Sequence, residues 1–418
     1  MQLATCNNKI MKTIIIFISL LISTHCFSQD ILDKYLQTAA ENNPGLKVKF
    51  NEYMAALERV PQVGALPDPS VAFGYFIQPI ETRLGPQQAK ISASQMFPWF
   101  GTLSARENSV EALAKAKYEL FEEAKSKLFY DVKATYYNLF FTEKAIGITL
   151  ENIGILSSFK SLANIKVEAG SASAVDAYRV EMEINDLENQ LALLRDNSTV
   201  LKVKFNTLLN VDEATTIQIA DELMGENLIS KQAEMDSIMA NNNALSSFDY
   251  QLEGLAYQKK TASKEGLPQF SIGLEYALIG EGNSTAGNAG QDAFVFPKVG
   301  LTIPLYRSKY KAKVQEVVYL QEAKSFEKSD KQNTLTVLFE SVWKDYQDAN
   351  RRFSLYQEQT DLAQKSLSIL ESNYATNNLD FEEILRMERK LLKYELELVK
   401  AVADKEASVA FVKYLQGK

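Results

Sequence analysis

Residues 95–101 read Gln95-Met96-Phe97-Pro98-Trp99-Phe100-Gly101, and they separate two segments of different periodicity. Before them, over residues 91–97, apolar side chains alternate with small polar ones, which is the pattern of a β-strand. After them, residues 102–168 contain no proline and carry apolar residues at steps of three, four or seven. This spacing predicts one helix of about 100 Å that begins directly after the strand.

The same succession occurs a second time, further along the chain. Residues 268–276 repeat the alternation of residues 69–75 at an offset of 199, and residues 303–306 repeat residues 97–100 at an offset of 206. Each copy reads as short helix, strand, loop, strand, long helix, turn and returning helix, so we predict an internal repeat. The expected first repeat, linker and second repeat are residues 29–210, 211–243 and 244–418.

The predicted strands carry apolar residues on one face and small, polar or charged residues on the other. An antiparallel sheet with one solvated face and a set of membrane-barrel strands both fit this pattern. Polar loops are expected at residues 78–88 and 281–292. Aromatic residues stand at the strand ends, where a barrel has its membrane-interface girdle: Phe97, Trp99, Phe100 and Tyr306. Four strands cannot close a barrel and lipid excludes open edges, so the membrane interpretation requires oligomerisation, for instance three chains with twelve strands.

The turns that join the long helices carry the candidate functional residues. The returning helix of the first repeat has leucines at heptad spacing, which indicates a coiled-coil seam. The residues that fit helix C-caps at the two turns are Gly170, Ser171, Asn377 and Asn378. Six residues beyond each cap lies an acid, and three residues later an arginine: Asp176 with Arg179, and Glu383 with Arg386, at an offset of 207.

Two interpretations of these acids stay open. In a trimer the acids would form a ring of negative charge at a tunnel entrance, and bonds to the two arginines would hold a constriction. Alternatively, each acid simply favours the helix dipole and each acid–arginine pair adds a few tenths of a kcal/mol.

The N-terminus predicts secretion. Residues 14–22 are apolar, follow Met11-Lys12-Thr13 and precede small and polar residues, which is the pattern of a signal peptide within residues 1–28, with Met11 as a candidate start. The apolar run is shorter than the roughly 20 residues of a membrane-spanning helix. Cleavage near Ser28 is expected; the alternative is a lipid-carrying Cys26.

Cleavage near Ser28 would remove both cysteines and the single histidine. Thiolate nucleophiles, Ser-His-Asp relays, imidazole zinc sites and disulfides all require those residues. The net charge of −8 argues against nucleic acid as a partner. We therefore expect no enzyme activity, no cofactor and no metal site.

The repeated layout, the run from Gln95 to Gly101 and the acids six residues beyond the caps resemble the TolC family of outer-membrane efflux proteins, from about Gln29 to the C-terminus. The resemblance implies a mainly α-helical chain whose four strands join a trimeric twelve-stranded β-barrel that continues into a long coiled-coil tunnel in the periplasm. It also implies a homotrimer in the outer membrane, a passive exit duct that docks through its turns to a periplasmic adaptor (membrane fusion) protein and an inner-membrane pump of the RND type.

One position departs from the family pattern, and two segments favour one group of its members. Glu383 matches the family's first tunnel-entrance acid, but Arg386 replaces the second acid, which bears on closure and cation affinity. The segments Pro67-Asp68-Pro69 and Phe97 to Gly101 look more like members paired with heavy-metal exporters than like drug-export members. The alternative function is a periplasmic coiled-coil adaptor or scaffold without a membrane barrel.

Overall fold

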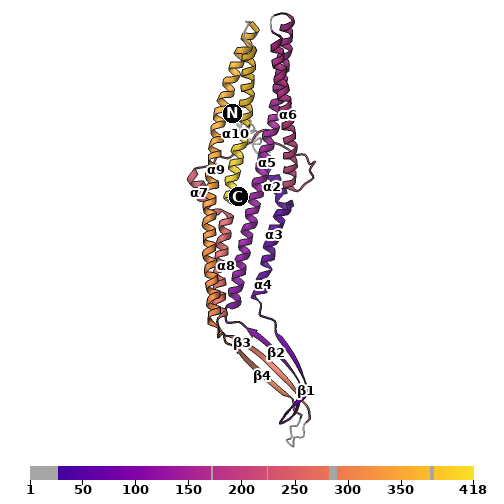
Figure 1. Ribbon diagram of the computed structural model, residues 1–418, viewed down its shortest axis with the longest axis vertical. Coiled ribbons are helices and arrows are strands. Elements are labelled where there is room, and N and C mark those ends of the chain that lie inside the picture. The colour runs from indigo at the N-terminus through magenta and orange to yellow at the C-terminus, as the bar shows by residue number, and fades with distance from the viewer. Residues whose placement is uncertain (1–26, 171–172, 224, 282–289, 377–380) are drawn as a thin grey trace, which may run out of the picture. The chain divides into compact units, whose positions relative to one another are not determined.

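The computed structural model describes residues 27–170, 173–223, 225–281, 290–376 and 381–418 (Figure 1). The chain divides into two compact units, which are described separately. One unit, here called the hairpin unit, comprises the chain up to Val48 together with Glu122–Asn243 and Gln332–Lys418. The other, here called the sheet unit, comprises Lys49–Phe121 and Ala244–Lys331.

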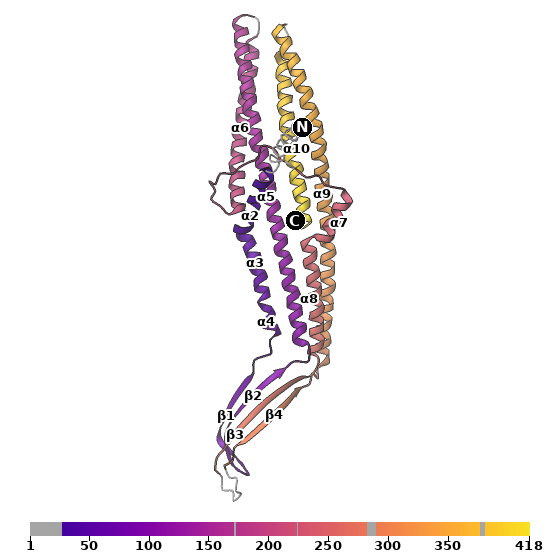
Figure 2. The same cartoon turned by 180° about the vertical axis from the view of Figure 1, so that it is seen from behind.

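The hairpin unit consists of helices. It contains α2 (Phe27–Asn42), most of α5 (Thr102–Glu168), α6 (Ala174–Leu209), α7 (Lys231–Asn241), the later part of α9 (Arg307–Thr376) and α10 (Phe381–Leu415). Helices α5 and α9 match the predicted long helices, and α6 and α10 return beside them as hairpins (Figures 1 and 2). The predicted linker at 211–243 holds α7. None of the described helices has a stretch long and apolar enough to cross a membrane.

Local sequence explains where α6 begins and ends. The Ser173 side chain accepts a hydrogen bond from the Val175 N–H at 3.2 Å, which satisfies one of the unpaired amides at the start of the helix. At the other end Asn210 adopts a left-handed conformation with a φ of 52°, a geometry that asparagine tolerates.

A hydrophobic core joins the four long helices near the tips of their hairpins. It contains Leu156 from α5, Val180 and Leu187 from α6, and a larger group from α9 and α10. The buried members from α9 and α10 are Ala363, Leu367, Tyr374, Phe381, Ile384, Leu385, Leu391 and Leu392. This core determines which polar side chains at the helix ends can meet.

The sheet unit contains α3 (Pro44–Leu57) from Lys49 onward, α4 (Arg59–Gly64), the start of α5, α8 (Asn243–Glu265) from Ala244 onward and the start of α9. Its strands are β1 (Ser70–Thr82), β2 (Gly85–Phe97), β3 (Gln269–Ile279) and β4 (Ala293–Thr302). They form an antiparallel sheet in the order β1-β2-β3-β4, so β1 and β4 lie at its edges.

The register places most of the large apolar side chains of the four strands on one face. Directly opposite residues share a face, and the pairs Phe73↔Ile91, Ile91↔Tyr276 and Ile272↔Val299 are apolar. The other face is small, polar or charged, as in the row Ser94↔Gly273↔Lys298. The face pattern predicted from the sequence is therefore present in all four strands, with interruptions where the register shifts.

The prediction of a polar loop at residues 78–88 is wrong for most of its length. Strand β1 continues to Thr82 and β2 starts at Gly85, with Ile80↔Gln87 and Thr82↔Gly85 as backbone partners. Pairing between the backbones extends the ladder through these polar residues, and the Thr82 hydroxyl donates to the Gly85 carbonyl at 2.7 Å. The predicted loop at 281–292 falls largely on residues 282–289, outside the described residues, and β4 ends at Thr302, before Ile303.

Candidate functional site at the first turns of α6 and α10

The first of the two candidate turns lies between α5 and α6. Gly170 has a φ of +70°, and a Cβ added there would meet no atom within 4 Å, so the backbone conformation is what favours glycine at this position. The other candidate turn residues, Ser171, Asn377 and Asn378, lie outside the described residues.

A chain of ion pairs connects the first turns of α6 and α10. Arg179 on α6 lies 3.7 Å from Asp176 on the same helix and 3.6 Å from Glu382 on α10. Glu382 in turn accepts a hydrogen bond of 2.9 Å from Arg389, whose guanidinium lies 3.8 Å from Glu183 on α6. Two arginines and three acids therefore link the two returning helices.

Glu383 and Arg386, the other predicted pair, interact within α10. Arg386 donates to Glu383 three residues earlier, and both side chains are largely exposed. The acid that reaches α6 is Glu382, which sequence reasoning missed. The only signal was that Glu382 and Glu383 are adjacent, and the sequence could not show which of the two faces the neighbouring hairpin.

The tips of α5 and α9 also meet. Lys166 donates to the backbone carbonyl of Tyr374 at 3.0 Å, and its ammonium lies 3.3 Å from the centre of the Tyr374 ring. Burial, followed by the negative charge of Asp176, raises the pKa of the Tyr374 hydroxyl, which keeps it neutral. This cation–π contact joins the same two hairpins and was not foreseen from the sequence.

The polar contacts between the two hairpins are individually weak. The side chains of Arg179, Glu382 and Arg389 are between about a third and a half exposed, and ion pairs of this kind contribute roughly 0.2–1 kcal/mol each. Burial raises the pKa of Glu183 although the charge of Arg389 opposes the shift. These weak polar contacts add to the hydrophobic core that joins the two hairpins.

The four predicted interface aromatics lie at the ends of strands. Trp99 stacks on Phe270 with ring centres 5.7 Å apart, and Phe100 lies 6.2 Å from Trp99. Phe97 is the register partner of Phe270, while Tyr306 is exposed between β4 and α9. Their role at a membrane interface stays a prediction.

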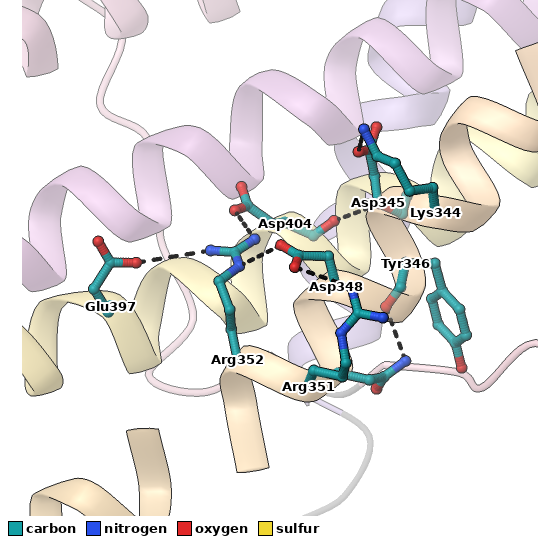
Figure 3. Close-up of polar contacts among 10 residues, drawn as sticks. Lys344, Asp345, Tyr346, Asp348, Arg351, Arg352, Glu397 and Asp404 are labelled. Carbon is teal, nitrogen blue, oxygen red and sulfur yellow. Dashed lines mark hydrogen bonds and ion pairs between the residues drawn. The ribbon is translucent and has the colours of Figure 1, made fainter. Parts of the chain in front are cut away.

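A second polar cluster lies on α9 and α10 (Figure 3). Arg352 donates to Asp348 at 2.8 Å and to Asp404 on α10 at 2.7 Å, and lies 3.8 Å from Glu397. The cluster lines a groove of about 490 Å³ whose apolar wall includes Tyr130 and Phe411. Its carboxylates fasten α10 to α9, a structural role that accounts for the contacts observed.

Comparisons with known proteins agree with this architecture. No family model matches the chain. One curated relative, toxin and drug export protein A of Aggregatibacter actinomycetemcomitans, is 21% identical over 266 residues, which cover 61% of this chain and 56% of that protein. The match therefore spans little more than half the length of the relative.

Solved structures of outer-membrane channels are similar over nearly the whole chain. The outer-membrane protein VceC of Vibrio cholerae aligns with a TM-score of 0.74 and 12% identity over 93% of this chain and 98% of that one. The Campylobacter jejuni CmeC outer-membrane channel aligns with a TM-score of 0.72 and 15% identity over 93% and 85%. CusC, a protein that forms a transmembrane channel, aligns with a TM-score of 0.72 and 15% identity over 92% of both chains.

The chain therefore has the fold of these outer-membrane channels. The fold implied by the resemblance to the TolC family, a mainly α-helical chain with four strands, is confirmed.

Proposed function

We propose that this chain is the subunit of an outer-membrane channel, a homotrimer whose strands close a twelve-stranded barrel and whose helices form a tunnel in the periplasm. The channel would be the passive exit duct of a tripartite efflux system. The curated relative is named for toxin and drug export, and the structural relatives are named as outer-membrane channels, which supports this assignment.

The observation that carries the proposal is the sheet. Its apolar face runs across all four strands, and Phe73, Tyr75, Ile77 and Val299 are exposed on it. Exposure of a continuous apolar patch of this size to water is unfavourable, whereas lipid would cover it. Within a bilayer, the backbone groups of the edge strands β1 and β4 must be hydrogen-bonded. An edge strand of another copy would supply the missing partner.

The mass of the protein extracted from purified outer membranes tests the proposal. Light scattering with the detergent contribution subtracted should give three mature chains. The alternative, a periplasmic adaptor or scaffold with an ordinary sheet, predicts a protein in the soluble periplasm or inner-membrane fraction with no outer-membrane trimer. That result would replace the channel assignment.

The ion pairs at the first turns of α6 and α10 are proposed to hold the tunnel entrance. Asp176 and Glu383 would contribute the acidic ring, and Arg179 and Arg386 the bonds that hold it. Replacing both acids with alanine should raise single-channel conductance in planar bilayers. Unchanged conductance would count against a gate at this level.

The cargo would be delivered by partner proteins. The turns around Gly170 and Asn377 are the proposed docking sites for a periplasmic adaptor and an inner-membrane pump of the RND type. The resemblance of residues 67–69 and 97–101 favours heavy-metal cations as cargo, while the name of the curated relative favours toxins and drugs. Export assays with each class of compound in a deletion strain distinguish the two.

A further inference from the structure

The last turns of α8 line a groove that carries three lysines. The groove has a volume of about 450 Å³, and the charged residues of its described lining are Lys259, Lys260 and Lys264, with no acid among them. The uncharged part of the lining consists of Ala256, Ser263 and Gln321. Lys259 and Lys260 are exposed. The groove, here called the lysine groove, therefore presents positive charge to its surroundings.

No acid in the described parts of the chain pairs with these lysines. The Lys264 ammonium donates to the Phe100 carbonyl at 2.9 Å, and the Lys260 ammonium lies 4.7 Å from the centre of the Tyr257 ring. The next residue of α8, Glu265, is already paired with Arg106 at 2.8 Å and with Lys313 at 2.7 Å. The positive charge of the lysine groove is therefore not compensated within the sheet unit.

The helix dipole accounts for one of the three lysines. Lys264 lies in the last turn of α8, where the dipole favours a cation. Lys259 and Lys260 lie more than one turn before the end of the helix, where the dipole has little effect. Another reason is needed for two adjacent, exposed lysines at this place.

The internal repeat shows that the fold does not require these cations. At an offset of 199, which also relates the strands that follow, the three lysines have uncharged counterparts in the first repeat: Val60, Pro61 and Ala65. The first repeat thus leads into β1 without the charges that precede β3 in the second. The charges therefore indicate a partner outside the fold, and an uncompensated positive groove fits an anionic partner.

The lysine groove is continuous with the apolar face of the sheet through Phe100, whose carbonyl accepts the lysine hydrogen bond. The Phe100 ring lies 6.3 Å from the Phe270 ring, on which Trp99 also stacks. Phe270 belongs to the apolar face, where its register partners are Phe97 and Leu301. At a membrane surface, aromatic rings lie at the level of the headgroups and lysines meet anionic headgroups. The groove and the ring cluster together have this arrangement.

We propose that the lysine groove binds the phosphate of an anionic phospholipid in the leaflet that faces the periplasm. Lys259 and Lys260 contact the headgroup, and the rings of Trp99 and Phe100 lie beside the acyl chains. The inference rests on the proposed function, because only a sheet inserted in a bilayer brings a lipid headgroup to this level. It assigns a lipid partner to the second repeat that the first repeat lacks.

Quenching of tryptophan fluorescence by brominated lipids tests the contact. The chain has two tryptophans, so Trp343→Phe leaves Trp99, beside the groove, as the single reporter. The full-length protein is reconstituted in phosphatidylcholine vesicles in which a rising fraction of the lipid is dibrominated phosphatidylglycerol. The quenching curve gives the affinity for phosphatidylglycerol relative to phosphatidylcholine, and dibrominated phosphatidylcholine supplies the reference value.

The protein with Trp343→Phe alone should prefer phosphatidylglycerol. Adding Lys259→Gln/Lys260→Gln should lower the relative affinity by roughly fivefold for each lysine replaced, whereas Lys259→Arg/Lys260→Arg should keep it. The matched control is Lys115→Gln/Lys117→Gln, which removes the same charge from α5. Those two lysines already lie 2.8 Å and 3.7 Å from acids, so the control should keep the preference.

The outcomes separate the lipid site from the proposed function. No preference in the parent protein, or an equal loss in the glutamine variant and the control, overturns the lipid site; if light scattering still gives three chains, the channel assignment stands. A glutamine variant that no longer forms three chains, while the control does, would mean that a second copy covers the lysines, which also overturns it. If the parent protein gives one chain, the proposed function fails as well.

Discussion

The carboxyl of Glu388 on α10 is buried without a partner for one of its oxygens. The residue is 3% exposed, and Oε2 has no hydrogen-bond partner within the part of the chain that the structure describes. Burial, followed by the negative charges of Glu371 on α9 and Glu395 on α10, raises the pKa of Glu388 from 4.5 to about 7. A shift of this size corresponds to about 3 kcal/mol of unfavourable free energy when the group is ionised in the folded protein.

The sign of the effect follows from the raised pKa. The folded protein keeps the Glu388 proton between pH 4.5 and about 7, while the unfolded chain loses it. The free energy of unfolding therefore falls as the pH rises through this interval, and the full cost is present above it. Glu388→Gln removes the charge and keeps the size of the side chain. With an unfolding entropy of about 2.1 cal/mol/K per residue, its thermal midpoint should lie about 4 °C above wild type at pH 8.5 and within about 1 °C at pH 5.

Far-ultraviolet circular dichroism during heating, at one scan rate in one detergent, measures the difference. The matched control is Glu181→Gln, because Glu181 is the repeat counterpart of Glu388 at an offset of 207 and lies 3.3 Å from Lys160 with a half-exposed side chain. The control should show no gain at either pH. A Glu388→Gln midpoint that differs from wild type by the same amount at both pH values would refute the reasoning.

Three further predictions use other parts of the chain. Arg179→Ala breaks the link between Asp176 and Glu382 and should raise single-channel conductance more than Arg386→Ala does, because the Arg386 pair lies within α10 and joins no second helix. Gly154→Ala, in a helix interior with no atom within 4 Å of the added Cβ, should stabilise the protein by about 0.5–1 kcal/mol, while Gly170→Ala should destabilise it by about 1–2 kcal/mol because of its positive φ, both measured by thermal unfolding. Phe73→Lys on the apolar face should cost roughly 2–4 kcal/mol and lower the trimer yield from outer membranes, whereas Ala72→Lys on the other face should not.

The periodicity of apolar residues predicted the long helices and the two faces of the strands. The long helix predicted at residues 102–168 agrees with α5, and the long helix expected in the second copy is α9, because proline-free amphipathic runs have few alternatives. The two faces of the strands were also predictable, since alternation fixes which residues share a face. The extension of β1 to Thr82 was not, because backbone pairing continues through residues whose composition is typical of a loop.

The partners of the candidate site could be predicted only in part. Sequence spacing predicts only a partner three residues away on the same helix. The ion pair between Asp176 and Arg179 agrees with that prediction. The contact from Arg179 to Glu382 depends on how α6 and α10 are rotated against each other, and that rotation is fixed by the buried side chains of Val180, Phe381 and Ile384. No pattern within one helix contains this information, so Glu382 could not be chosen over Glu383.

The repeat also explains why, among the described residues, Glu388 has no cation beside it. In the first repeat Glu181 pairs with Lys160 on α5, and the position equivalent to Lys160 on α9 is Leu367, a member of the buried core. The second hairpin therefore has apolar packing in place of the cation and keeps the acid, so one backbone arrangement holds an exposed ion pair in one half and a buried carboxyl without a cation in the other. Because an unpaired buried charge is costly, we expect the second hairpin to be the one whose packing weakens as the pH rises.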